Sequence, residues 1–145
     1  MIKKWWFRYT LGTVLGGFAG LSLSSSVLPS VVSSVVEVES FFIRYALGDY
    51  AVHAALVWAF AGWVVAKTGV PKIAPIILGA VGLGSGFLLG YVGFGIESNL
   101  IIVCGVAGGG YGVIGGLLLG NVLAAPAEED IAATDSDNPS GVVTR

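Results

Sequence analysis

Charged residues are scarce in this sequence, and their placement leaves long stretches with none. Of the 145 residues, 11% are charged, against about 25% in an ordinary soluble domain. Between Tyr9 and Ala127 the chain carries only Glu37, Glu39, Arg44, Asp49, Lys67, Lys72 and Glu97. A soluble domain with such long uncharged stretches would have too little polar surface to face water. The scarcity of charge therefore excludes an ordinary soluble fold.

The side chains that perform most enzymatic chemistry are also nearly missing. The chain has one cysteine, Cys104, and one histidine, His53, so no intrachain disulfide and no cysteine–histidine metal cluster can form. The two residues lie in different apolar stretches and make no nucleophile–base pair. The net charge of −2 comes without a basic stripe for nucleic acid. We expect a protein that is not an enzyme and has no catalytic residues, no metal site and no nucleic-acid partner.

The few charged residues separate four apolar runs, at 9–36, 50–66, 73–96 and 98–127. A helix that crosses the hydrocarbon core needs about 20 mostly apolar residues, with a range of roughly 17–25. All four runs reach that length. The sequence therefore predicts an all-α integral membrane protein, a compact four-transmembrane-helix bundle. The predicted spans are residues 7–28, 41–66, 73–93 and 100–123.

The chain divides into a membrane domain, 1–124, and a tail, 125–145. We expect the first helix to end before Pro29, because proline lacks the amide hydrogen that a helix interior needs. The tail has five acidic residues, two prolines and no apolar periodicity, which predicts a disordered acidic segment. A cleaved signal peptide is the alternative interpretation of the start of the chain, where basic residues and an apolar stretch precede a serine run, 24–26.

The basic residues predict how the chain crosses the membrane. One side of the predicted bundle receives Lys3, Lys4, Arg8, Lys67 and Lys72, and the other side receives Arg44. Basic residues are enriched in cytoplasmic loops, so both termini are expected to be cytoplasmic. The expected location is a bacterial or archaeal inner membrane or a thylakoid-type membrane.

Small residues repeat at every fourth position of the predicted spans, and 22 of the 23 glycines precede residue 121. In span order, the repeated residues are Gly12, Gly16 and Gly20; Ala51, Ala55 and Ala59; Gly82, Gly86 and Gly90; and Gly108, Gly112, Gly116 and Gly120. Residues four apart share one helix face, and small residues let helix backbones approach closely in a bilayer. The pattern predicts helix–helix packing through glycine and alanine (GxxxG) faces.

Glycines also occupy other faces of the third and fourth predicted spans, including Gly84, Gly105, Gly110 and Gly115. Either the protomer uses all of these faces internally, or some of them meet partner helices. We favour a non-catalytic accessory or assembly subunit of a larger membrane complex, for example an energy-transducing or photosynthetic one. Its partners would be other membrane subunits and lipid.

A small homo-oligomeric channel or a holin-like pore is the first alternative function. Two fragments, 91–95 and 109–113, are similar to the potassium-channel filter in their glycine-rich sequence. Such a filter replaces the hydration shell of an ion with backbone carbonyls. The first fragment would make the preceding run a re-entrant pore helix and would place Lys67 and Lys72 outside, against the charge asymmetry.

His53 is the candidate ligand or proton site, because an ionisable residue inside a span is a functional hypothesis by default. Asp49 precedes it by four residues, which would place both on one helix face. Three uses are open: a proton relay with Asp49, an axial ligand for haem or a chlorophyll-type pigment, and a structural hydrogen bond near the interface. His53 followed by Trp58 and Trp63 resembles the antenna proteins of photosynthetic bacteria, a resemblance that implies pigment binding. We favour the structural role and expect no cofactor.

Overall fold

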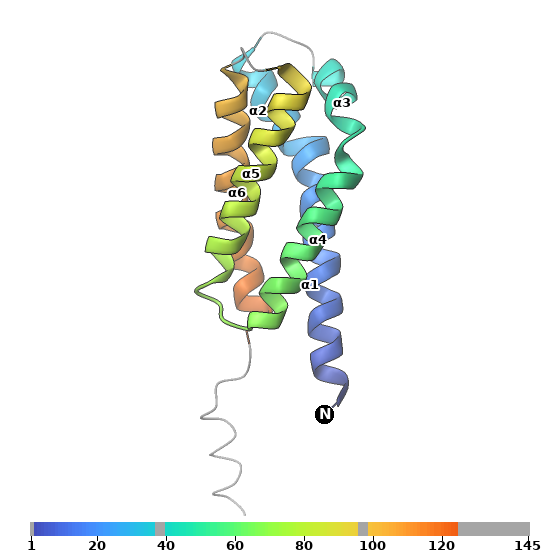
Figure 1. Ribbon diagram of the computed structural model, residues 1–145, viewed down its shortest axis with the longest axis vertical. Helices are drawn as coiled ribbons and strands as arrows, with labels where there is room; N and C mark the ends of the chain where they lie inside the picture. The colour runs from blue at the N-terminus through green and yellow to red at the C-terminus, as the bar shows by residue number, and fades with distance from the viewer. Residues whose placement is uncertain (1, 37–39, 96–98, 125–145) are drawn as a thin grey trace, which may run out of the picture.

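Every regular element in the described residues, 2–36, 40–95 and 99–124, is helical in this computed structural model (Figure 1). In chain order the elements are α1 (Ile2–Ser22), the π-helix η1 (Leu23–Val27), α2 (Leu28–Val35), α3 (Ser40–Gly48), α4 (Ala51–Thr68), α5 (Ala74–Phe94) and α6 (Leu100–Val122). The predicted acidic tail, 125–145, lies outside the described residues.

Four helical segments are long and apolar enough to cross a membrane: Trp5–Val35, Ala51–Thr68, Ala74–Phe94 and Leu100–Val122. At 21 residues, α5 is roughly 31 Å long, which matches a hydrocarbon core about 30 Å thick. Large apolar side chains cover the outside of the bundle, and Ile76, Leu88 and Leu118 are each more than half exposed. The prediction of an all-helical fold with four segments long and apolar enough to span a membrane is confirmed for the described residues.

The first span differs from the prediction, because the helix does not end at Pro29. It continues as η1 and α2 as far as Val35. A proline inside a regular helix removes one hydrogen bond and clashes with the carbonyl of the fourth residue before it. Here the wider π turn precedes the proline, and serine hydroxyls at 24, 25 and 30 bond to backbone carbonyls of the previous turn. Both adjustments let a membrane helix pass through a proline.

The second span is also interrupted where a continuous helix was predicted. The expected span 41–66 is divided into α3 and α4 by a turn at Asp49 and Tyr50. At its other end, α4 stops at Gly69, whose φ of 64° is the left-handed conformation that closes many helices. The following helix, α5, begins at Ala74 with Pro75 in its first turn.

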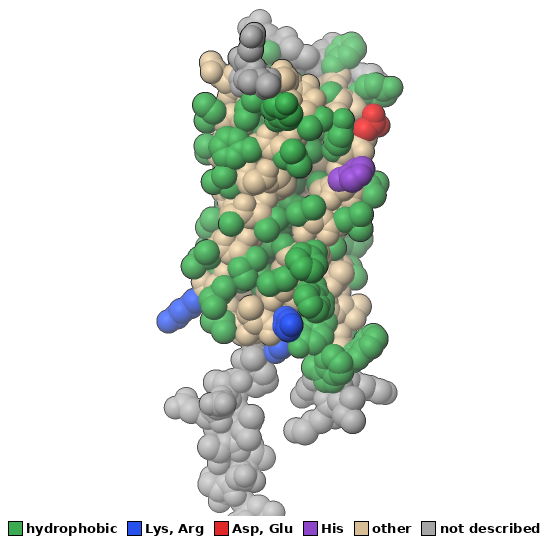
Figure 2. Space-filling view, viewed as in Figure 1, with side chains coloured by type: hydrophobic (Ala, Val, Ile, Leu, Met, Phe, Trp, Pro, Cys, Tyr) green, Lys and Arg blue, Asp and Glu red, His purple; other side chains and the backbone are tan. Residues whose placement is uncertain are grey.

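The helices associate as two antiparallel pairs, α1 with α4 and α5 with α6, and the two pairs contact each other much less (Figure 1). The beginning of α1 and the end of α6 lie at the same end of the bundle. The blue Lys and Arg side chains visible in Figure 2 gather at this end, and the acidic and histidine side chains lie toward the opposite end.

Glycine lies at each level of the contact between α5 and α6. A Cβ atom added to Gly82 would overlap the carbonyl oxygen of Gly108, and one added to Gly108 would overlap that of Gly82. A Cβ atom on Gly86 would likewise overlap the carbonyl oxygen of Cys104, and one on Gly112 would overlap that of Leu78. Gly90, Gly116 and Gly120 extend this line of close approach along the two helices. The two backbones therefore touch over most of the length of the pair.

The α1–α4 pair has a similar contact, but α4 uses a different set of residues from the predicted one. Cβ atoms on Gly12, Gly16 and Gly20 would meet Gly62, Trp58 and Ala54 of α4, in that order. The contact face of α4 is therefore Ala54, Trp58, Gly62 and Ala66, all buried. The predicted stripe of Ala51, Ala55 and Ala59 lies beside this face, where the last two border Gly17.

The two filter-like fragments are helical except for Gly95, which follows the last residue of α5. Residues 91–94 belong to α5 and residues 109–113 to α6. The carbonyls of a helix bond to amides of the next turn and cannot line an ion path in the way that a filter requires. The comparison with the potassium-channel filter was therefore wrong.

Candidate functional site

Trp58 joins the two helix pairs near the middle of the bundle. Its side chain is fully buried, and its indole Nε1–H donates a hydrogen bond to the Ser85 hydroxyl of α5 at 3.1 Å. On the α6 side, its ring lies 5.6 Å from the ring of Tyr111, centroid to centroid. Ser85 in turn donates to the carbonyl of Val81 at 2.6 Å. Trp58 therefore contacts both α5 and α6 from α4.

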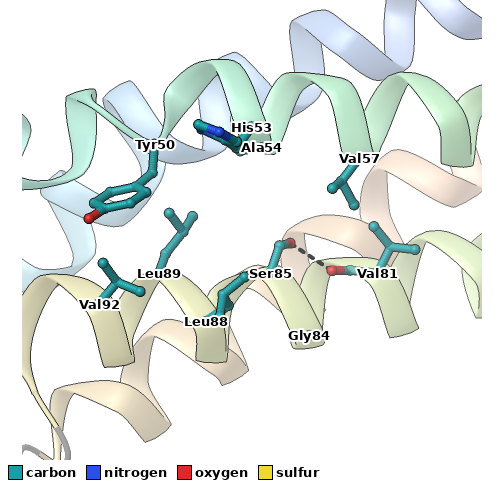
Figure 3. Close-up of a pocket in the computed structure, with 10 residues that line it drawn as sticks. All are labelled: Tyr50, His53, Ala54, Val57, Val81, Gly84, Ser85, Leu88, Leu89 and Val92. Carbon is teal, nitrogen blue, oxygen red and sulfur yellow. Dashed lines mark hydrogen bonds between the residues drawn. The ribbon is translucent and has the colours of Figure 1, made fainter.

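A groove runs between α4 and α5 beside this hydrogen bond, with a volume of about 480 Å³ (Figure 3). Its walls are Tyr50, His53, Ala54 and Val57 from α4 and the residue before it, and Val81, Gly84, Ser85, Leu88, Leu89 and Val92 from α5. Tyr50 and Val92 lie at one end of the groove, and Val57 and Val81 lie at the other. Gly84, which has no side chain, and Ala54, whose side chain is one methyl group, leave the space between these ends open.

Polar groups in the groove are concentrated at one end. Tyr50 belongs to the turn that divides α3 from α4, and its ring lies 6.5 Å from that of His53. Deeper in the groove the one polar side chain is Ser85, whose hydroxyl already donates to Val81 and accepts from Trp58. The rest of the wall is apolar. The groove thus offers hydrogen-bonding groups at its mouth and apolar contact along its length.

His53 and Asp49 are both exposed, but the helical spacing expected between them does not apply. Asp49 lies in the turn, whereas His53 lies in α4. The His53 ring lies beside the ring of Tyr50. The two predicted residues therefore lie near the same end of the bundle. They are not on one continuous helix, which the prediction of a shared helix face required.

The tryptophans named in the antenna resemblance do not share the surroundings of His53. Trp58 is buried between the helix pairs, and a separation of five residues places it roughly 140° around the helix from His53. Trp63 stacks on Phe60 and lies under the ammonium group of Lys67, 5.3 Å from the ring centroid. In the described residues, no group of three His, Cys, Asp or Glu side chains is placed to hold a metal ion.

The surplus glycines noted in the sequence fall into two groups. Gly105 and Gly109 face Phe87 and Leu83 of the neighbouring helix and therefore belong to the α5–α6 contact. A Cβ on Gly84, Gly110 or Gly115 would meet nothing within 4 Å. Gly84 borders the groove, and Gly110 is exposed on α6.

No protein-family description, no curated protein and no solved structure matches the chain. The groove, the open glycines and the Trp58 contacts are therefore the observations from which a function is argued.

Proposed function

We propose that this protein is a non-catalytic accessory subunit of a larger membrane complex, and that it docks against a partner helix through the outer face of α6. This face is formed by Val106, Gly110, Ile114 and Leu117. The proposal places both termini in the cytoplasm, on the side of the Arg8, Lys67 and Lys72 cations, and leaves the acidic tail free there.

The open position of Gly110 supports this proposal most directly. Gly110 is two residues from Gly108, roughly 200° around the helix, so it points away from α5. Its neighbours Val106, Ile114 and Leu117 are 67%, 63% and 53% exposed. Glycine inside a helix is about 1 kcal/mol less favourable than alanine. No contact inside the protomer requires a glycine at position 110. Close approach of a partner helix backbone at Gly110 would require one.

The glycines at the internal contacts have a different part in the proposal. We propose that the glycine faces of α1, α5 and α6, with the Ala54–Gly62 face of α4, stabilise the bundle itself through close backbone packing. A leucine at Gly86 or Gly112 would collide with the backbone of the paired helix. Such variants would break the protomer and would not report on partner binding, so the open glycine is the appropriate site for a test.

The test compares Gly110→Leu with Ala80→Leu, which adds the same side chain to an exposed position of α5. Each variant is expressed in its native membrane, extracted in mild detergent and sized by gel filtration. We expect Gly110→Leu to elute free of the complex with unchanged helicity, because the added side chain blocks the close approach of a partner helix. Ala80→Leu and His53→Ala should remain in the complex. Retention of Gly110→Leu in a particle of full size would contradict docking at this face.

A further inference from the structure

We propose that the groove between α4 and α5 binds one acyl chain of a membrane phospholipid, with the headgroup at Tyr50 and His53. This site is independent of partner docking, because it lies between α4 and α5 whereas the docking face lies on the outer side of α6. The length of the groove, its width and the placement of its polar groups support this occupant.

The groove has the length of one leaflet. Its α5 wall runs from Val81 to Val92, which is roughly 16 Å of helix. Half of a hydrocarbon core is about 15 Å thick. Val92 lies two residues before the end of α5, so the groove begins near the membrane surface and ends near the middle of the bilayer.

The width of the groove selects a chain over a helix. A volume of 480 Å³ spread over the length of this wall gives a cross-section of about 30 Å². A helix with its side chains is about 10 Å across, which corresponds to a cross-section of roughly 80 Å². A single hydrocarbon chain can therefore lie inside the groove, whereas a partner helix is too wide to enter it and would rest across its opening.

The polar groups match a lipid that enters from the surface. The Tyr50 hydroxyl and a His53 ring N–H can donate hydrogen bonds to the ester and phosphate oxygens of a headgroup. Tyrosine and histidine side chains of this kind keep an apolar body in the membrane and a polar tip toward its surface. Below them, the Ser85 hydroxyl is already bonded to Val81 and Trp58. A ligand with polar substituents along its length, such as a chlorophyll-type macrocycle, would leave them without partners.

Gly84 keeps the groove open, and this gives a specific test. The full-length protein is reconstituted in phosphatidylcholine vesicles that contain a phosphatidylcholine with a diazirine in one acyl chain. After photolysis, the labelled peptides are identified by mass spectrometry. We expect the label to concentrate on Ala54–Val57 and Val81–Val92 relative to the equally exposed outer face of α6. Gly84→Leu should lower the groove label several-fold, because its side chain occupies the path of the lipid.

Two comparisons make this test decisive. Ala80→Leu adds the same bulk to α5 outside the groove and should leave the labelling pattern unchanged, and circular dichroism confirms that both variants fold. Labelling spread evenly over all lipid-facing residues would overturn the proposal, as would groove labelling that Gly84→Leu does not reduce. A visible absorption band in the protein from native membranes that is lost in His53→Ala would assign the groove to a pigment and would also overturn it.

Discussion

The indole of Trp58 donates a hydrogen bond to the hydroxyl of Ser85 across the boundary between the two helix pairs. The two pairs touch much less than the helices within each pair, and Trp58 also contacts the ring of Tyr111 on α6. The α4–α5 groove lies directly beside the bond. The same contact that joins the pairs therefore also shapes the proposed lipid site.

Replacing Ser85 with alanine should destabilise the junction of the two pairs. The Trp58 N–H would remain buried without its acceptor, at a cost of about 1–2 kcal/mol. Unfolding in mixed micelles of mild detergent and increasing SDS measures this change. Trp58→Phe and the double variant complete a double-mutant cycle. We expect the double variant to lose less unfolding free energy than the sum of the two single variants, because both remove the same hydrogen bond. If the two effects simply add, the bond contributes nothing to stability.

Alanine substitutions two residues apart on α6 should have opposite effects. At Gly112 the new methyl group would overlap the carbonyl of Leu78, and we expect a loss of at least about 1 kcal/mol in unfolding free energy. At Gly110 the methyl group meets open space, and the variant should gain up to about 1 kcal/mol from helix propensity. Equal tolerance of both substitutions would show that glycine at the α5–α6 contact is not needed for packing.

Gly69→Ala should weaken the turn that joins α4 to α5. Gly69 has a φ of 64°, and this conformation costs a residue with a Cβ atom roughly 1–2 kcal/mol. Gly48→Ala is the control, since Gly48 also ends a helix but has no positive φ and nothing near its Cβ position. Thermal unfolding in detergent should show a lower midpoint for Gly69→Ala alone. A lower midpoint for both variants would point to a general effect of alanine at helix ends.

The proposed orientation can be tested with single cysteines in a Cys104→Ser background. Val70→Cys lies in the α4–α5 turn between Lys67 and Lys72, and Tyr45→Cys lies on α3 at the opposite end. Both positions are exposed. In intact cells, a membrane-impermeant maleimide should label Tyr45→Cys at once and Val70→Cys only after permeabilisation. The reverse pattern would place the cationic end outside and contradict the positive-inside assignment.

The number and character of the spans were predictable, because the placement of the few charged residues along the chain is enough to reveal apolar runs of sufficient length. The end of the first helix was not. The rule that proline breaks helices was outweighed at Pro29 by the preceding π turn and by nearby serine hydroxyls. The contact face of α4 differs for another reason. Small residues lie on adjoining faces of α4, and periodicity did not show that the face with Ala54, Trp58 and Gly62 meets α1.

The groove itself had no signal in the sequence. It depends on how α4 lies against α5, where the Trp58–Ser85 hydrogen bond joins residues 27 positions apart. Gly84 and His53 were singled out for other reasons, one as a surplus glycine and one as an ionisable residue inside a span. Only the packing of the helices shows that the two residues line one cavity.

The composition of the particle obtained from native membranes in mild detergent tests the proposed function most directly. Proteins that co-purify with the full chain are identified and quantified by mass spectrometry. The account predicts a fixed stoichiometry with larger membrane subunits, and loss of those subunits in Gly110→Leu. A homo-oligomer with no other protein bound would contradict the accessory role and would favour the channel or holin-like alternative.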